Sequence, residues 1–416
     1  MQVLHDTAAG APAGPAASAS DDKACGAPAA GPLESCVRCG SCKAQCPTYA
    51  EDAAEGMGAR GRVMLLMQLA EGALEPSETL EHRIFSCLLC GACTASCPLG
   101  VDVTEALYEG RARLRRLRKS KDFLGLGLRL GLKRAPSSIK VLRFFQDMGE
   151  VFPLHRIPPF RQLKALGIIA PDASLRDGAS LYKAARPKAR IAVFAGCTVN
   201  FLYPHIGYAL IRSLNALHYD VVLPKGEVCC GAPLRGLGFE DDAIEMAERN
   251  LAVFRKMNVE AVIGLCPTCV HTVRDEYRKR GGDGIDNAVE VARFFSDKAP
   301  QLHALKGRTE GGQQIVYHEP CHSRYSLSSG KEPQRLLASL GVPPVEAEQG
   351  CCGFGGPFRV LYPDLAEALL EKRAAAYRHA EVIATSCPNC ILQLRSGMKD
   401  KSIKHLIEVI DETITG

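Results

Sequence analysis

Nineteen of the 416 residues are cysteines, and all but Cys25 belong to repeated cysteine patterns. The stretches "CVRCGSCKAQCP" and "CLLCGACTASCP" each carry a C-x2-C-x2-C-x3-C run that ends in proline. Three thiolates on one tight loop can grip three irons of a cubane [4Fe–4S] cluster, whereas the fourth starts the next turn and reaches a second cluster. The spacing therefore predicts two cubane clusters that exchange their fourth ligands.

This exchange decides which cysteines belong to which cubane cluster. The first cluster takes Cys36, Cys39, Cys42 and Cys97. The second cluster takes Cys87, Cys90, Cys93 and Cys46. Zinc is the alternative metal, because paired C-x2-C motifs also bind it. A zinc ion needs only four ligands, so the third evenly spaced cysteine and the C-P of each copy would be superfluous.

Two sets of five cysteines follow in the second half of the chain. Each set has a single cysteine, a vicinal pair followed by glycine, and a C-P-x-C motif. The first pentad is Cys197, Cys229, Cys230, Cys266 and Cys269. The second pentad is Cys321, Cys351, Cys352, Cys387 and Cys390. The three parts are offset by 124, 122 and 121 positions between the copies, which indicates an internal duplication.

Five thiolates exceed what one cubane cluster requires. Adjacent cysteines can ligate different irons of an irregular cluster or share an iron, and Gly231 and Gly353 let the backbone turn close to such a group. Two other readings stay open for each pentad, namely one zinc ion with a spare cysteine and a redox-active dithiol. We therefore expect one or two non-cubane iron–sulfur clusters in the pentads, with zinc in one of them as the alternative.

The elements around the pentads indicate an α/β fold. Short β-rich runs such as "RIAVFAGC" and "EAVIGLCPTC" alternate with helical patterns, and the order recurs with "QIVYHEPC" and "EVIATSCPNC". Strands that alternate with helices predict a parallel sheet, whose strand ends gather ligands. Around the N-terminal motifs, "RGRVMLLMQLAEG" and "SETLEHRIFS" have helical periodicity, and Ser77 is a candidate N-cap.

We therefore expect a multidomain α and α/β protein, with an N-terminal all-helical two-cluster ferredoxin domain followed by two duplicated α/β half-domains. Residues 1–31 are rich in Ala, Gly, Pro and Ser and are predicted to be a disordered tail, in which Cys25 binds nothing. The other predicted divisions are the ferredoxin domain at 32–118, a helical linker at 119–189, and half-domains at 190–310 and 311–416.

Two features beside the cysteine motifs have open roles. Residues 111–143 hold twelve Lys and Arg against one acid, Asp122, which indicates either a solvated basic helix face or a surface for anionic lipid or an acidic partner. Histidines near the motifs can be cluster ligands, hydrogen-bond donors that tune a potential, or satisfied core residues. They are His205, His271, His318 and His322, of which His322 is our choice for a chemical role.

The pentad pattern resembles the tandem CCG domain of the heterodisulfide reductase superfamily. That resemblance implies a non-cubane iron–sulfur cluster on five cysteines in each half-domain. With the ferredoxin motifs in front, the layout over residues 32–400 is similar to the iron–sulfur subunits of glycolate oxidase. Iron–sulfur subunits of lactate dehydrogenase, the third subunit of anaerobic glycerol-3-phosphate dehydrogenase and fused heterodisulfide reductase subunits share this architecture.

The sequence lacks the usual motifs for binding a flavin or nicotinamide cofactor. No P-loop occurs, and no G-x-G-x-x-G follows a strand and opens a helix, so we expect no flavin in this chain. Oxidising a 2-hydroxy acid usually needs a flavin to take the hydride. We therefore expect an electron-transfer subunit of a glycolate or D-lactate dehydrogenase, inert alone, that passes electrons from an FAD-containing partner to quinone or another acceptor. The alternative is a catalytic subunit that reduces a disulfide at a non-cubane cluster.

Charge and hydropathy set the expected surroundings. The net charge of +5 is small for this length and argues against a nucleic-acid partner. No secretory signal or run of about 18 apolar residues is visible, and reduced, metal-bound thiols suit a reducing compartment. We expect a cytoplasmic protein, with a peripheral place on the inner face of the cell membrane as the alternative.

Overall fold

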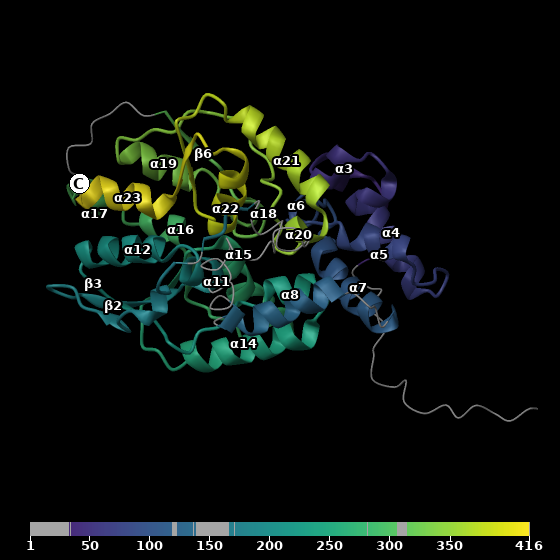
Figure 1. Ribbon diagram of the computed structural model, residues 1–416, viewed down its shortest axis with the longest axis horizontal. Helices are drawn as coiled ribbons and strands as arrows, with labels where there is room; N and C mark the ends of the chain where they lie inside the picture. The colour runs from purple at the N-terminus through teal and green to yellow at the C-terminus, as the bar shows by residue number, and fades with distance from the viewer. Residues whose placement is uncertain are drawn as a thin grey trace, which may run out of the picture.

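The computed structural model describes residues 33, 35–118, 123–135, 137–138, 166–169, 171–280, 282–305 and 314–415. The predicted tail at 1–31, with Cys25, lies outside the described residues. A group of helices from the N-terminal part stands beside a larger α/β body that contains two sheets (Figure 1). The expected mixture of an α part and an α/β part is confirmed.

Residues 35–118 contain helices and no strand. The helices are α2 (Ser41–Ala44), α3 (Pro47–Glu51), η1 (Glu55–Met57), α4 (Ala59–Ala70), α5 (Glu78–Phe85), α6 (Ala92–Ala95) and α7 (Val103–Arg118). Ser77 caps α5 as predicted, since its hydroxyl accepts a hydrogen bond from Leu80 N at 3.2 Å. Apolar residues such as Val63, Ile84 and Leu107 form the small core between these helices.

The first sheet follows the order β1-β3-β2-β4-β5. Its strands are β1 (Leu181–Tyr182), β2 (Ala189–Phe194), β3 (Tyr219–Val222), β4 (Ala261–Gly264) and β5 (Ala288–Glu290). All pairs are parallel except β1 with β3. Helices cover both faces of such a sheet, which explains why all four residues of β4 are buried and apolar or Gly. These helices are α11 (Gly196–Phe201), α12 (Pro204–Ala216), α13 (Ala232–Gly236), α14 (Glu240–Phe254), α15 (Pro267–His271), η4 (Thr272–Glu276), η5 (Arg278–Arg280), α16 (Val291–Ser296) and α17 (Ala299–Leu305).

The second sheet repeats the β2-β4-β5 side of the first. Its parallel strands are β6 (Ile315–Tyr317), β7 (Val382–Thr385) and β8 (Ser402–His405). A single parallel bridge between Val316 and Val345 stands where β3 pairs with β2 in the first sheet. The accompanying helices are α18 (Cys321–Tyr325), α19 (Glu332–Ser339), α20 (Phe358–Leu361), α21 (Pro363–Ala376), α22 (Pro388–Gly397) and α23 (Leu406–Thr415).

Helices of the two halves pack against each other, and the halves share one core. Helix α23 of the second half packs against α12 of the first, and α16 of the first half packs against α19 of the second (Figure 1). Arg212 on α12 forms an ion pair with Asp411 on α23. Residues from both sheets belong to one apolar cluster, so the pentads are held in a single body.

Two expectations for the middle of the chain are corrected by the described residues. The predicted helical linker at 119–189 includes α8 (Phe123–Lys133), but its last residues form the edge strand β1 and the start of β2. The basic face of residues 111–143 is partly used inside the molecule. Arg111 is buried and donates to Gly236 O at 2.7 Å, and Lys133 contacts Asp242 at 2.7 Å.

These contacts fasten α7 and α8 to α13 and α14, so those charges form neither a solvated face nor a lipid-binding surface. Within this segment, residues 119–122, 136 and 139–143 lie outside the described residues. The domain boundaries stay predictions. Among the described helices, none has the length and the apolar run that crossing a membrane requires.

Candidate metal centres

The structure brings together the four cysteines predicted for the first cubane cluster. Site 1 is a cavity lined by Cys36, Cys39, Cys42 and Cys97. The loop that carries three of them turns through Arg38 and Gly40, whose φ angles are 59° and 85°. These positive angles point successive thiols into one space, and Gly40 meets no penalty there. Cys39 is exposed, so site 1 reaches the surface.

The second set of four occupies an equivalent but buried place. Site 2 is a cavity lined by Cys46, Cys87, Cys90 and Cys93. Leu89 and Gly91 repeat the positive φ angles of the first loop, at 54° and 79°, and Leu89 N donates to Cys87 Sγ at 3.3 Å. Burial raises the pKa of the Cys93 thiol well above its ordinary value. Thiolates in such a place need bound cations to stabilise their charge.

The second pentad lies at the ends of β6 and β7. Cys387 is the N-cap of α22 and Cys390 is in its first turn, so the helix begins inside the C-P-x-C motif rather than after it. Cys390 Sγ lies 3.2 Å from Cys352 Sγ, and burial raises the pKa of Cys321 to about 12. Gly353 has φ 87°, and a side chain there would place its Cβ 2.5 Å from Ala366 O.

The first pentad repeats this arrangement at the ends of β2 and β4. Cys266 is the N-cap of α15, and Gly231 has φ 90°. Hydrogen bonds from Cys229 and Cys269 lower the pKa of Cys230 to about 5. The thiols of Cys269 and Cys387 both hydrogen-bond to Cys266 and lower its pKa. Because Cys387 belongs to the second pentad, the two pentads adjoin.

Reciprocal hydrogen bonds lock the two pentads to each other. The third residue of each C-P-x-C motif contacts the residue that follows the single cysteine of the other half. Thr268 Oγ1 lies 3.2 Å from His322 Nδ1, and Asn389 Oδ1 accepts from Thr198 Oγ1 at 2.7 Å. Sequence reasoning missed this pairing. The only signal was that Thr268 and Asn389 stand at the same position of the repeated motif.

The histidines divide into different roles. Burial lowers the pKa of His322 to about 4, and its ring bridges Thr268 and Cys321. The ring of His318 lies against two sulfurs. One of its nitrogens and the sulfurs of Cys352 and Cys390 are all within 4.8 Å of one another. His205 lies 3.4 Å from Glu408, on the outer contact between α12 and α23.

The N-terminal sites and the pentads form one row. Site 2 meets the second pentad at a cavity whose wall includes Cys46 and Cys90 on one side and Cys321 and Cys351 on the other. The order is therefore site 1, site 2, second pentad and first pentad. Among the described cysteines there is no disulfide bond, so all these thiols are available to a metal.

The spacing of the sulfurs bears on the choice of metal. A tetrahedral zinc ion with Zn–S bonds of about 2.3 Å holds its sulfurs about 3.8 Å apart. Within the described part of the chain, only His318, Cys352 and Cys390 place three metal-binding atoms within 4.8 Å of one another. The sulfurs of sites 1 and 2 are spread more widely around their cavities, which suits a cluster of several irons better than one ion.

Comparison with protein-family models matches both kinds of site. A cysteine-rich (CCG) domain matches residues 191–274 and again residues 315–395, and a 4Fe-4S dicluster domain matches residues 32–101. The chain therefore carries a 4Fe-4S dicluster domain followed by two CCG domains. The first pentad lies in the first CCG domain and the second pentad in the second.

Several curated proteins resemble the chain over almost its whole length. It is 27% identical to the probable glycolate oxidase iron-sulfur subunit of Bacillus subtilis, over 91% of this chain and 92% of that protein. The same identity, over 92% of this chain, relates it to the glycolate oxidase iron-sulfur subunit of Escherichia coli and to a component of the dihydromethanophenazine:CoB–CoM heterodisulfide reductase of Methanosarcina barkeri. Each match covers 94% of the relative. The predicted resemblance is confirmed, and the glycolate oxidase relatives are named as iron-sulfur subunits, which supports an electron-transfer role for this chain.

A second feature that sequence reasoning missed anchors the single cysteine of each CCG domain. Glu227, two residues before the vicinal pair, accepts hydrogen bonds from Ala195 N at 3.1 Å and Gly196 N at 2.8 Å. Gln349, at the equivalent place in the second CCG domain, accepts from Glu319 N at 3.0 Å. The Glu227 carboxylate in one domain and the Gln349 amide in the other accept equivalent backbone hydrogen bonds, because both side chains offer a carbonyl-type oxygen.

We expect Glu227→Gln to keep iron in the first CCG domain and Glu227→Leu to lower its retention by about 10- to 100-fold. Leucine offers no acceptor, so the N–H groups beside Cys197 lose their partner and the loop is no longer fixed. Iron per chain after a timed chelator challenge measures the effect. Glu248→Leu, at an exposed position of α14, is the matched control. Equal iron loss in both leucine variants contradicts the anchoring role.

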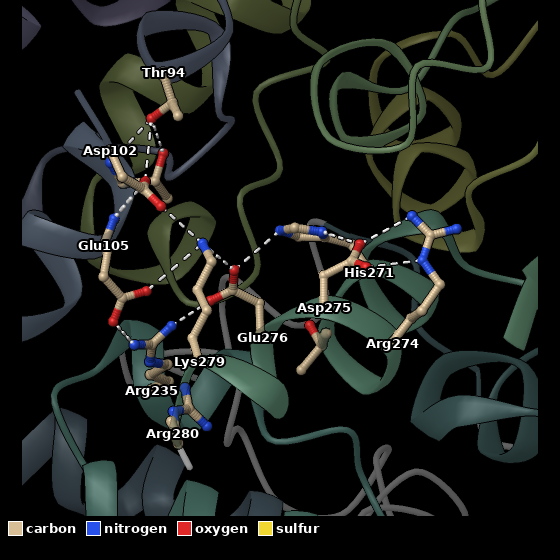
Figure 2. Close-up of polar contacts among 12 residues, drawn as sticks. Thr94, Asp102, Glu105, Arg235, His271, Arg274, Asp275, Glu276, Lys279 and Arg280 are labelled. Atoms are coloured by element: carbon tan, nitrogen blue, oxygen red, sulfur yellow. Dashed lines mark hydrogen bonds and ion pairs between the residues drawn. The ribbon is translucent and has the colours of Figure 1, made fainter. Parts of the chain in front are cut away.

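A buried ion network joins the dicluster domain to the first CCG domain (Figure 2). The Arg235 guanidinium, with its residue only 3% exposed, pairs with Glu105 on α7 and with Glu276 on η4. Lys279 Nζ extends the network to Asp102 at 2.8 Å and Glu276 at 2.9 Å. His271, two residues after Cys269, lies 3.3 Å from Glu276. The network therefore connects the cubane ligand region with the end of the first pentad.

Proposed function

We propose that this chain is the electron-transfer subunit of a flavin-linked 2-hydroxy-acid dehydrogenase, with glycolate as the first candidate substrate and D-lactate as the second. Sites 1 and 2 each hold a cubane cluster, and each pentad holds a non-cubane iron–sulfur cluster. Such clusters supply one-electron carriers. The observation that carries the proposal is the continuous row of four cysteine sites, from exposed Cys39 to the first pentad in the core.

The residues present fit clusters of this kind. The donors are thiols, glycines with positive φ clear space beside them, and backbone N–H groups at Leu89 and Gly353 point at sulfur. Gly353 N donates to Cys351 Sγ at 3.3 Å, which stabilises a thiolate ligand. The flavin belongs to a partner subunit with FAD, and the electrons leave to quinone or another acceptor. Reduced thiols favour a cytoplasmic place for the complex.

We place the flavoprotein partner at the rim of site 1. Val37 and Leu99 line this site and are 69% and 49% exposed, which is unusual for apolar side chains beside a reactive centre. Arg38 and Arg60 line the same cavity. An apolar patch edged with positive charge fits a partner surface with an apolar centre and an acidic rim.

We expect Val37→Asp to raise the flavoprotein concentration needed for half-maximal electron transfer by about tenfold, which corresponds to about 1.4 kcal/mol. The new carboxylate would be buried against the apolar centre of the partner surface, whereas the cysteine ligands stay in place. Ile244→Asp, at an exposed apolar position on α14, is the control. An unchanged concentration dependence in V37D with iron fully retained contradicts this docking site.

The function itself is tested by reconstitution. The purified chain is expected to be inert toward glycolate and to gain glycolate-dependent reduction of its clusters only with an FAD-containing partner. The alternative is a disulfide-reducing subunit of the heterodisulfide reductase kind. It is favoured by one observation, an apolar cavity at the second pentad lined by Phe354, Phe358 and the sulfurs of Cys351 and Cys352.

The two candidates predict different results with the chain alone. Under the alternative, the isolated protein reduces an organic disulfide when an artificial electron donor is supplied. Under our proposal the isolated protein does not reduce the disulfide. Glycolate and D-lactate are each tested as substrates together with the partner. The third subunit of anaerobic glycerol-3-phosphate dehydrogenase has the same architecture, so glycerol 3-phosphate serves as the third substrate. Disulfide reduction without any partner contradicts the proposal.

A further inference from the structure

The two CCG domains differ at one position that faces the vicinal pair. Three residues before the single cysteine, the first domain has Phe194 and the second has His318. Phe194 packs on Phe254, at the end of α14, with ring centroids 5.5 Å apart. His318 packs on Tyr377, just after α21, with ring centroids 5.9 Å apart. A polar ring pair in the second domain therefore replaces an apolar ring pair in the first.

The polar pair lies against sulfur. His318 is only 1% exposed, and one of its ring nitrogens is within 4.8 Å of the sulfurs of both Cys352 and Cys390. These two sulfurs are 3.2 Å apart. Cys352 is the second member of the vicinal pair, and hydrogen bonds from Cys351 and Cys390, followed by one from His318, lower the pKa of its thiol. Phe194 has no polar ring atom, so this position of the first domain cannot make the same bond.

The tyrosine orients the imidazole. The Tyr377 hydroxyl lies 2.9 Å from His318 Nδ1 and 3.4 Å from Gln349 Oε1. Gln349 Oε1 already accepts from Glu319 N at 3.0 Å, so the hydroxyl can give its proton to the shorter contact with His318 rather than to Oε1. Nδ1 is then an acceptor, and the ring proton is on Nε2. This is the tautomer in which the histidine can donate to a thiolate. The same hydroxyl therefore selects both the ring orientation and the donor atom.

We propose that His318 donates a hydrogen bond to the sulfurs of the second pentad and thereby raises the reduction potential of the centre bound there above that of the first CCG domain. The inference rests on the proposed function, since it requires an iron–sulfur centre at each pentad. Reduction adds negative charge to the sulfur ligands, so a donor stabilises the reduced form more than the oxidised form. In this proposal His318 acts through Cys352 and Cys390, as a positioning residue.

The test is an anaerobic redox titration followed by EPR in a Cys229→Ser background, so that the irregular centre of the second CCG domain titrates without that of the first. At the midpoint potential of this background, His318→Phe is expected to lower the ratio of reduced to oxidised centre by about tenfold, which equals about 59 mV for one electron. His318→Gln, which can donate an N–H, restores part of the ratio. The cubane centres keep their potentials.

Tyr377→Phe is the second variant, needed if His318→Phe fails to retain the iron–sulfur centre of the second pentad. It keeps the imidazole but removes the group that orients it, and it is expected to shift the ratio in the same direction with iron retained. An unchanged midpoint in H318F or Y377F, with iron retained at the second pentad, overturns the inference and leaves the proposed function intact. Absence of iron from both pentads in the unsubstituted protein overturns the proposed function as well.

Discussion

Serine in place of Cys90 is expected to remove about four irons per chain and to slow reduction of the pentad centres by at least about 100-fold. Cys90 is buried where site 2 meets the second pentad, in the cavity that Cys321 and Cys351 also line. A serine hydroxyl is a much poorer ligand for iron than a thiolate. The substitution therefore breaks the row of sites at its middle.

The experiment compares iron content, the EPR signal of each centre and the rate at which the pentad centres are reduced by substrate and flavoprotein. Site 1 and both pentads are expected to keep their iron, so the lost rate reports the broken connection rather than unfolding. Cys25→Ser is the matched control, because Cys25 belongs to none of the motifs. Undiminished reduction of the pentads in C90S means that electrons enter at the CCG domains directly.

Replacing Arg235 with methionine is expected to destabilise the protein by about 3–5 kcal/mol. The substitution leaves the carboxylates of Glu105, Glu240 and Glu276 near one another without their shared cation, and Glu276 is buried. Methionine retains much of the apolar stem of arginine, so the substitution removes the charge and changes the packing little. Thermal and denaturant unfolding of the iron-loaded protein, followed by circular dichroism, measure the loss.

Two comparisons separate this effect from a general sensitivity to arginine loss. Arg278→Met removes an exposed ion pair with Asp286 in the same region and is expected to cause no measurable change. Adding Glu105→Gln to Arg235→Met removes one of the three carboxylates that lost Arg235 and is expected to restore part of the stability. Similar unfolding midpoints for R235M and R278M contradict the role assigned to the network.

The sequence patterns with a fixed local period were sufficient for much of the fold. Apolar runs predict β2, β4, β6 and β7, and the repeated cysteine offsets indicate the duplication. The second sheet is smaller than the duplication suggests. The strand equivalent to β3 is reduced to a bridge at Val345, because Pro343 and Pro344 just before it have no N–H to donate.

What the patterns could not supply were contacts between distant segments. Thr198 meets Asn389 across 191 residues, and Arg111 meets Gly236 across 125. Neither pair has a local sequence signature, because threonine and arginine occur as readily on a solvated surface as at an internal contact. The same limit applies to Arg111 in the basic segment and to His318, because the residues that they contact, Gly236 and Tyr377, come from distant parts of the sequence.

The most direct test is the metal content of the whole chain, isolated without oxygen and analysed for iron, acid-labile sulfide and zinc alongside Mössbauer and EPR spectra. Two cubane and two irregular centres predict about sixteen irons per chain if each has four, with no stoichiometric zinc. About eight irons, all in cubane centres, with zinc or no metal at the pentads, would contradict the four-site row on which the electron-transfer proposal depends.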